Sequence, residues 1–263
     1  MNKIAICGKG GSGKSTVAAL LARALHDKNY KVLVVDSDES NTGLHRLLGF
    51  DKAPLSIMDM MGGRKSLKDK LPPKSPVGLA RTRTDMMSDQ EIRIDSIPEG
   101  YINISGDGIA MIGVGKINEA MEGCACPIGA LGKELLAKLH LEPGQIVLID
   151  MEAGIEHFGR GVESGVDAVL IVVDPSYESV DLAERINRVS RQMDIGHIYA
   201  VLNRVTSREM ADSLTKKLED RGIQLIGNIR YDDGTFQAGL DGVAITGDVS
   251  SGDAADIVSK LFK

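Results

Sequence analysis

Near its N-terminus the chain reads Gly8-Lys9-Gly10-Gly11-Ser12-Gly13-Lys14-Ser15, with Thr16 directly after it. This stretch matches the phosphate-loop pattern of Gly, any four residues, and then Gly-Lys-Ser. The apolar run 3–7 before it predicts a buried strand, and residues 16–25 after it have the apolar spacing of a helix. In that context the glycines let successive N–H groups point at one anion, and the helix N-terminus adds its dipole.

The parts of this loop have separate expected tasks. We expect the whole stretch from Gly8 to Thr16 to bind a nucleotide. The Lys14 ammonium is placed for the β- and γ-phosphates, and the Ser15 hydroxyl is placed for a magnesium ion. The sequence therefore predicts an ATP hydrolase with ATP and Mg²⁺ as its cofactors.

Composition narrows the class of protein and of partner. Of the 263 residues, 43% are hydrophobic and 26% are charged, which is ordinary for a globular protein. A formal net charge of −6 argues against a nucleic-acid surface, which needs clustered basic charge. No secretory leader precedes the first strand, and the longest apolar run, 168–173, is too short to cross a bilayer. We expect a cytoplasmic protein with no membrane partner.

The pattern along the chain predicts the fold class. Apolar runs that read as strands alternate with amphipathic segments that read as helices, as in an α/β doubly wound, mostly parallel sheet with helices on both faces. We predict a single domain, 1–263, with a β insertion at 75–105 in which 92–97 and 101–105 form a hairpin. The expected strands are 30–35, 108–115, 145–150, 168–173, 198–203 and 223–227, and the expected helices include 131–139, 178–193, 208–220 and a C-terminal one, 254–263, packed on the domain.

Acidic residues follow two of the expected strands. Asp36 and Asp38 come after 30–35, and Asp150 ends the apolar run 146–149. In an open parallel sheet, ligands gather at the carboxyl ends of strands, so these acids belong beside the phosphates. Asp150 has the position of a Walker B aspartate, which holds Mg²⁺ through water. For Asp36 and Asp38 the alternative stays open that acids simply end a strand.

The second loop residue, Lys9, gives the phosphate loop two lysines. In this the chain resembles the dimeric ATPases with a deviant phosphate loop, among them the nitrogenase iron protein and the Min-type, Par-type, arsenite and tail-anchor ATPases. The resemblance implies that Lys9 reaches the nucleotide of a partner subunit, which would tie ATP binding to formation of a homodimer. A solvated loop lysine is the alternative.

The same resemblance implies roles for residues elsewhere. Asp38 would orient or deprotonate the attacking water and lie near Mg²⁺ through water, with Glu39 where the family usually has Pro. Gly154, four residues after the Walker B aspartate, would face the γ-phosphate. Asn203 would read the adenine ring, and the loop 229–236 would complete the base pocket. For Asn203 a turn role at the strand end is the alternative.

The sequence Cys124-Ala125-Cys126 sets this chain apart from a plain ATPase. Two thiols one residue apart do not complete a tetrahedral site, because a thiolate site wants four ligands. A symmetric dimer supplies two more, so a shared Cys₄ site across the two-fold axis is possible. Two cysteines without a ligand are the alternative, and with Cys7 they make three, too few for a disulfide framework.

The cysteine pair and the run from Glu152 to His157 together resemble the nickel-insertion ATPases that mature carbon monoxide dehydrogenase, the CooC type. This resemblance implies that Cys124 and Cys126 hold Zn²⁺ or Ni²⁺ at the dimer interface, and that the client is a nickel enzyme such as carbon monoxide dehydrogenase. We interpret His157 as a hydrogen-bonding residue. Two alternatives remain, an iron–sulfur electron carrier like the nitrogenase iron protein and a Min- or Par-type spatial organiser.

Overall fold

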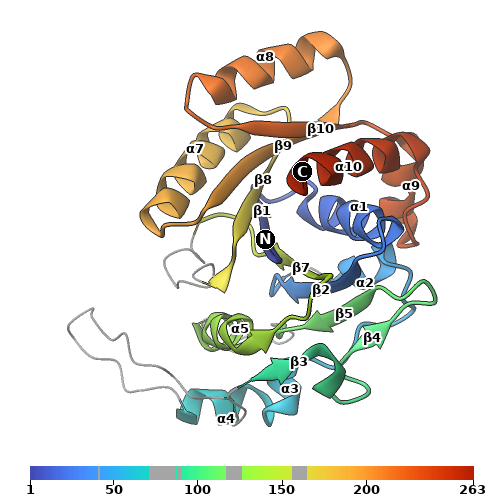
Figure 1. The fold of residues 1–263 in the computed structure, drawn as a ribbon, viewed down its shortest axis with the longest axis vertical. Coiled ribbons are helices and arrows are strands. Elements are labelled where there is room, and N and C mark those ends of the chain that lie inside the picture. Colours follow the sequence, from blue (N-terminus) through green and yellow to red (C-terminus); the bar gives the residue numbers. More distant parts are fainter. Residues whose placement is uncertain (41, 71–86, 88–90, 117–125, 156–164) are drawn as a thin grey trace.

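The computed structural model describes residues 1–40, 42–70, 87, 91–116, 126–155 and 165–263. Its centre is an eight-stranded sheet in which all neighbouring strands pair in parallel except the last two, which are antiparallel (Figure 1). The order is β10 (Leu225–Arg230), β9 (His197–Val205), β8 (Ala168–Val173), β1 (Lys3–Gly8), β7 (Gln145–Met151), β2 (Lys31–Ser37), β5 (Ala110–Gly113) and β4 (Asn103–Ile104). The predicted α/β fold with a mostly parallel sheet is confirmed.

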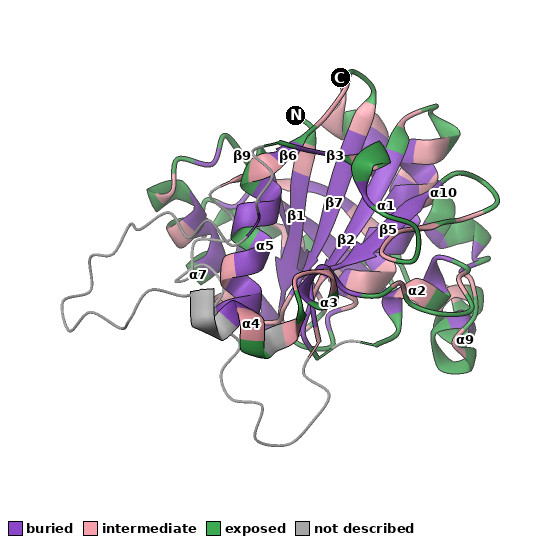
Figure 2. Cartoon of the chain, turned by 90° about the horizontal axis from the view of Figure 1, so that it is seen from below, coloured by how far each residue is buried: buried purple, intermediate pink, exposed green. Residues whose placement is uncertain are grey.

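Helices cover both faces of this sheet (Figures 1 and 2). One face carries α1 (Lys14–Asp27), α2 (Leu44–Leu47), α9 (Asp233–Asp241) and α10 (Asp248–Leu261), and the other carries α3 (Ile57–Met60), α4 (Gly63–Lys70), α5 (Cys126–Lys138), α7 (Tyr177–Gln192) and α8 (Arg208–Glu219). Alternate residues of β1 belong to the two cores, because successive side chains of a strand point to opposite faces. Ile4 and Ile6 belong to the core between the sheet and the helices on the side of α1, which we call the α1 core. Ala5 and Cys7 belong to the core between the sheet and the helices on the side of α5, which we call the α5 core.

The central position of β1 decides where a ligand can bind. The strand lies between β7 and β8, so the sheet extends from it in both directions. In such open sheets the crevice lies outside the carboxyl ends of the strands, where the connections diverge. The phosphate loop follows β1 at this point, and the loops after β2, β7 and β9 leave the same edge of the sheet.

The predicted hairpin of 92–97 with 101–105 is wrong. A short strand β3 (Ile92–Arg93) pairs in parallel with β6 (Leu139–His140) in a separate two-stranded sheet, and a 3₁₀ turn, Ile94–Ser96, follows it. The second segment supplies β4, which pairs with β5 instead. Ile92 and Ile97 are both buried in the α5 core, and burial of these side chains outweighs a local two-stranded pairing. About half of the predicted insertion, 75–86 and 88–90, lies outside the described residues.

Two expected boundaries also differ near the C-terminus. Part of the predicted loop 229–236 is helical, because α9 begins at Asp233. Its cap is Asp232, whose carboxylate accepts a hydrogen bond of 2.8 Å from the Thr235 N–H. The last helix begins at Asp248, well before the expected 254, since its first turns contain glycine and serine and carry little apolar pattern.

The C-terminal helix packs on the domain, as the sequence predicts. Its residues Ala254, Ile257 and Val258 are buried against α1 and β10. The approach to β10 is close at Gly227, where an added Cβ would lie 2.6 Å from Cγ1 of Ile257. In the part of the chain that the structure describes, no helix has both the length and the apolar character to cross a membrane.

The packing of α10 predicts a stability effect. Ile257→Ala should lower the free energy of unfolding by about 2–5 kcal/mol, because it leaves a cavity between the helix and β10. Urea unfolding followed by circular dichroism measures this change. The matched control is Asp256→Ala on the exposed side of the same helix, which should stay within about 0.5 kcal/mol. Equal small effects of both substitutions would contradict the packing described here.

Candidate functional site

The phosphate loop connects β1 to α1 through a backbone that only glycine fits at two positions. Gly8 has a φ of 145°, and an added Cβ would collide with the carbonyl oxygen of Val172 in β8. Gly13 has a φ of 92°, and an added Cβ would collide with the side-chain amide of Asn203. The loop therefore lies closely against the ends of two neighbouring strands, β8 and β9. Its shape is fixed by these close approaches as well as by its own sequence.

The end of β9 supports this loop from behind. The Asn203 side-chain amide donates a hydrogen bond of 2.8 Å to the Ser12 carbonyl, and Arg204 donates one of 2.9 Å to the Gly11 carbonyl. Arg204 has a left-handed backbone with a φ of 59°. The sequence did not predict either contact, because nothing in a local pattern indicates that two residues nearly 200 positions away would bind the loop.

The acidic residues meet because of strand register. In the pairing of β2 with β7, Asp36 lies directly beside Asp150, so the two carboxyl groups come from adjacent strands. The Ser15 hydroxyl donates a hydrogen bond of 2.5 Å to Asp150 Oδ2. Asp150 is fully buried, and its Oδ1 has no hydrogen-bond partner among the described residues.

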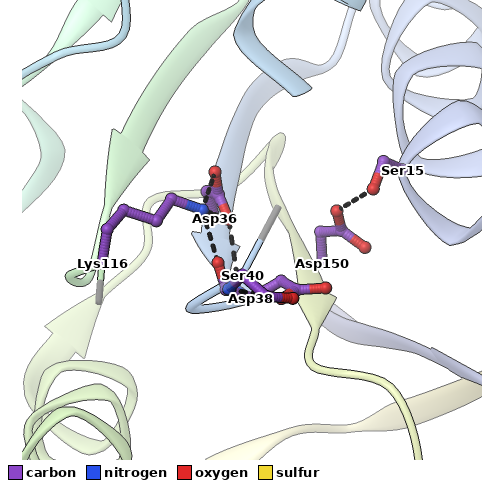
Figure 3. A network of polar contacts seen from close by, with 6 residues as sticks. All are labelled: Ser15, Asp36, Asp38, Ser40, Lys116 and Asp150. Atoms are coloured by element: carbon purple, nitrogen blue, oxygen red, sulfur yellow. Dashed lines mark hydrogen bonds and ion pairs between the residues drawn. The ribbon is translucent and has the colours of Figure 1, made fainter. Parts of the chain in front are cut away.

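On the other side of this cluster, Lys116 contacts the β2 end (Figure 3). Its ammonium lies 2.8 Å from both carboxylate oxygens of Asp36 and also donates to the Asp38 carbonyl. The Asp38 carboxylate accepts hydrogen bonds from the N–H of Ser40, at 2.9 Å, and from its hydroxyl, at 2.7 Å. Three carboxylates therefore gather at the carboxyl ends of two strands, with Lys116 on one side and Ser15 on the other.

Burial raises the pKa of two of these carboxyl groups. For Asp150 it raises the pKa to about 7, the charges of Asp36 and Asp38 act in the same direction, and the Ser15 hydrogen bond and Lys14 oppose it. For Asp36 burial raises the pKa to about 6, against the attraction of Lys116. Burial disfavours the ionised form of these two acids, and a divalent cation bound beside them would stabilise that ionised form.

The residues present fit a magnesium ion. The Ser15 hydroxyl and the unpaired, buried Oδ1 of Asp150 are hard oxygen donors, which Mg²⁺ prefers. Magnesium usually keeps several waters and uses one or two protein ligands beside substrate phosphates. That agrees with a second finding: the described residues contain no group of three or more His, Cys, Asp or Glu side chains arranged as a complete metal cage.

A cavity of about 540 Å³ lies over the phosphate loop, a size typical of small-ligand sites. Its lining includes residues of the loop together with Asp38 and Asn203. It also includes apolar and aromatic side chains, among them Tyr231 and Phe236, whose ring centroids are 5.9 Å apart. Residues of the segment 229–236, which the sequence predicts to complete the base pocket, are also part of this lining. From the loop the cavity includes Gly10, Gly11, Gly13, Lys14, Ser15 and Thr16.

The remaining predicted residues lie as follows. Gly154 donates its N–H to the Gly8 carbonyl at 3.2 Å, which puts it beside the loop. Lys9 donates to the Ser176 hydroxyl at 3.2 Å and lies 3.9 Å from the Glu178 carboxylate of its own chain. Cys126 is the first residue of α5. Cys124 and His157 lie outside the described residues.

The buried Asp150 carboxyl predicts a pH dependence of stability in the metal-free protein. Its pKa of about 7 in the fold exceeds the ordinary value of 3.8. Between these values the folded protein holds the proton more tightly than the unfolded chain does. The stabilisation is therefore complete below about pH 3.8 and is lost as the pH rises to about 7.

Asp150→Asn removes this ionisation. It should raise the free energy of unfolding in EDTA by about 1–4 kcal/mol at pH 8, and by less at pH 5. Thermal unfolding at the two pH values measures the difference. Asp212→Asn, at an exposed position of α8, is the control and should change neither value. A gain of equal size at both pH values would mean that the carboxyl of Asp150 is already ionised at low pH.

Comparison with known proteins places this site in a family. A model of the CobQ/CobB/MinD/ParA nucleotide binding domain matches residues 3–245. The chain is 39% identical to an uncharacterized ATP-binding protein of Methanocaldococcus jannaschii, over 99% of this chain and 100% of that one. It is 35% identical to the carbon monoxide dehydrogenase accessory protein CooC of Rhodospirillum rubrum, over 90% of this chain and 88% of that one.

A solved structure supports the fold independently. The septum site-determining protein MinD of Pyrococcus horikoshii, complexed with Mg-ADP, aligns with a TM-score of 0.69 and 17% identity, over 100% of this chain and 96% of that one. The family match spans the phosphate loop, both acidic strand ends and the β9 contacts described above. The chain therefore belongs to the CobQ/CobB/MinD/ParA nucleotide-binding family and is a P-loop ATPase of that family.

Proposed function

We propose that this ATPase uses ATP-dependent dimerisation to control a metal ion held by Cys124 and Cys126 of two subunits, and that it delivers nickel to an enzyme of the carbon monoxide dehydrogenase type. One observation carries the proposal: the Cys-x-Cys sequence occurs in a chain that is 35% identical to a carbon monoxide dehydrogenase accessory protein. Thiolates suit zinc and can also hold nickel, so the purified protein can carry zinc even where nickel is the cargo.

For nucleotide binding and hydrolysis, we assign roles to the phosphate loop and the acidic residues. The loop backbone from Gly8 to Thr16 and the Lys14 ammonium would hold the phosphates. Ser15 would bind Mg²⁺ directly, and Asp150 would hold it through water. The ion would supply charge neutralisation on the phosphates. Asp38, which lines the cavity together with the loop residues, would orient the attacking water.

The base end of the cavity has the chemistry to hold an adenine ring. Tyr231 and Phe236 offer aromatic faces, and Asn203 lines the same cavity. The nitrogen of its side-chain amide already donates to the phosphate loop. Its amide oxygen accepts no hydrogen bond from a described residue, so that atom is the one we assign to the base. Asn203 would then serve the loop and the base at once.

The nucleotide end lies close to the helix that carries the second cysteine. Helix α5 begins at Cys126, and there is room for little more than a methyl group between its Gly132 and the Ser37 hydroxyl, because an added Cβ would lie 3.6 Å from that hydroxyl. Ser37 lies between the two acidic residues at the end of β2. A movement of this strand end on nucleotide binding would therefore take place next to α5. This proximity supports the idea that ATP changes the arrangement of the thiols.

The decisive experiment is the metal content of the purified protein. Elemental analysis of the wild type should give about one zinc or nickel ion per two subunits, because four thiolates complete one site. Cys124→Ser and Cys126→Ser should each lose the metal. Cys7→Ala is the matched control and should retain it, because Cys7 is buried within β1.

Four results would go against this site. One ion per subunit, or full retention in the Cys124 and Cys126 variants, would rule out a shared Cys₄ centre. Iron and sulfide in stoichiometric amounts would instead favour the iron–sulfur carrier. Metal that is bound equally by monomer and dimer would contradict a site at the two-fold axis, since an ion that binds only the dimer must stabilise it by mass action.

Lys9 provides a separate test of the dimer. Lys9→Ala should still bind ATP, because Lys14 keeps its place on the phosphates, but it should fail to dimerise with ATP. Light scattering after size exclusion, with and without ATP, measures the mass. The exposed Lys216→Ala on α8 is the control and should dimerise as the wild type does. A Lys9→Ala protein that dimerises normally would mean that the role of Lys9 lies in its contacts with Ser176 and Glu178 of its own chain.

A further inference from the structure

Lys116 is a partly buried charge near the nucleotide site that the phosphate-loop chemistry does not explain. It follows β5, and its side chain is only 20% exposed. Its ammonium lies 2.8 Å from both oxygens of the Asp36 carboxylate and also donates to the Asp38 carbonyl (Figure 3). A lysine ammonium has three N–H donors, and these three oxygens match them in number.

The contacts of Lys116 fix the path of the chain from Asp36 to Asp38. The Asp36 carboxylate accepts a hydrogen bond of 3.2 Å from the Asp38 N–H while it is paired with Lys116. Lys116 therefore holds both the N–H side and the carbonyl side of residue 38, the first through Asp36 and the second directly. The Asp38 carboxylate is held separately, by Ser40. Together these bonds determine where the carboxylate sits along the cavity wall.

Electrostatics gives a second reason why this position needs a cation. Three buried carboxyl groups, those of Asp36, Asp38 and Asp150, lie at the ends of two adjacent strands. Like charges that are close together in a buried site repel each other strongly. Lys14 faces the phosphate side of this cluster and lines the cavity. Lys116 reaches the opposite side, through Asp36. Its removal would leave the strand end paired with β7 but would take away the direct anchor on Asp38, which is the first residue after β2.

We propose that Lys116 is a positioning residue for ATP hydrolysis, which acts by holding Asp38 at the phosphate end of the cavity. This inference rests on the role proposed above for Asp38. Lys116 is not among the described residues that line the cavity, and the contacts given above join it to the end of β2 and to Asp38. Its effect is therefore expected on the rate of the chemical step and not on the binding of ATP.

The test is a set of steady-state measurements with Mg-ATP. Lys116→Met keeps the length of the side chain and removes its charge. It should lower kcat by about 10- to 100-fold, as small misplacements of a reacting group do, and it should leave KM and the affinity for a fluorescent ATP analogue within about 3-fold. Lys116→Arg restores the charge and should recover part of kcat. Lys138→Met is the control, a comparably buried lysine paired with Glu134 on α5, and it should keep its kcat.

A double-mutant cycle separates a positioning role from a structural one. If Lys116 acts through Asp38, Lys116→Met should cost little further rate in the Asp38→Asn background. An unchanged kcat in Lys116→Met, additive losses in the cycle, or an effect on KM alone would each overturn the inference. Circular dichroism of every variant identifies loss of folding, and in that event Lys116→Arg in the same cycle decides.

The cycle also distinguishes a failure of this inference on Lys116 from a failure of the role proposed for Asp38. If Asp38→Asn hydrolyses ATP at the normal rate, the assignment of Asp38 is wrong, and the positioning role of Lys116 falls with it. If Asp38→Asn is slow while Lys116→Met is normal, Asp38 keeps its role and only the inference on Lys116 is overturned.

Discussion

The site depends on one constraint, the parallel register in which β2 pairs with β7. That register sets Asp36 beside Asp150, and so it brings two buried carboxyl groups to the point where the phosphate loop leaves β1. A shift of one residue would turn each side chain to the opposite face of the sheet. Both strands are buried on both faces, so such a shift would disrupt the close packing of every side chain in the two cores.

The parts of the site that the sequence predicts are those encoded locally. The phosphate loop and the apolar strand ending in Asp150 each lie within a few residues, and the chemistry of each follows from the order of its side chains. Lys116 and Arg204 could not be predicted in the same way. Their partners lie 78 to 80 and 193 residues away, and only the assembled sheet brings them together.

The same distinction holds for the fold. Strands with unbroken apolar runs were predicted correctly because burial on both faces is visible in the sequence. The segment 92–105 alternates apolar and polar residues, which is the pattern of a hairpin, yet its two halves pair with different partners. Ile92 and Ile97 are both buried in the core that contains the apolar side chains of α5. Short polar elements of this kind are decided by tertiary packing and not by their own pattern.

The bonds that Asn203 and Arg204 make to the phosphate loop have a consequence for affinity. They belong to the protein itself, so they form when the chain folds. Fixing the backbone of a residue costs about 1–2 kcal/mol in conformational entropy, and here folding meets that cost for the glycine-rich turn in advance. Little ordering of the turn is then left for association to drive, and a preorganised turn of this kind discriminates poorly between a diphosphate and a triphosphate. Discrimination between the two nucleotides must then come from groups that contact the terminal phosphate itself, the task expected of the Lys14 side chain and of Gly154.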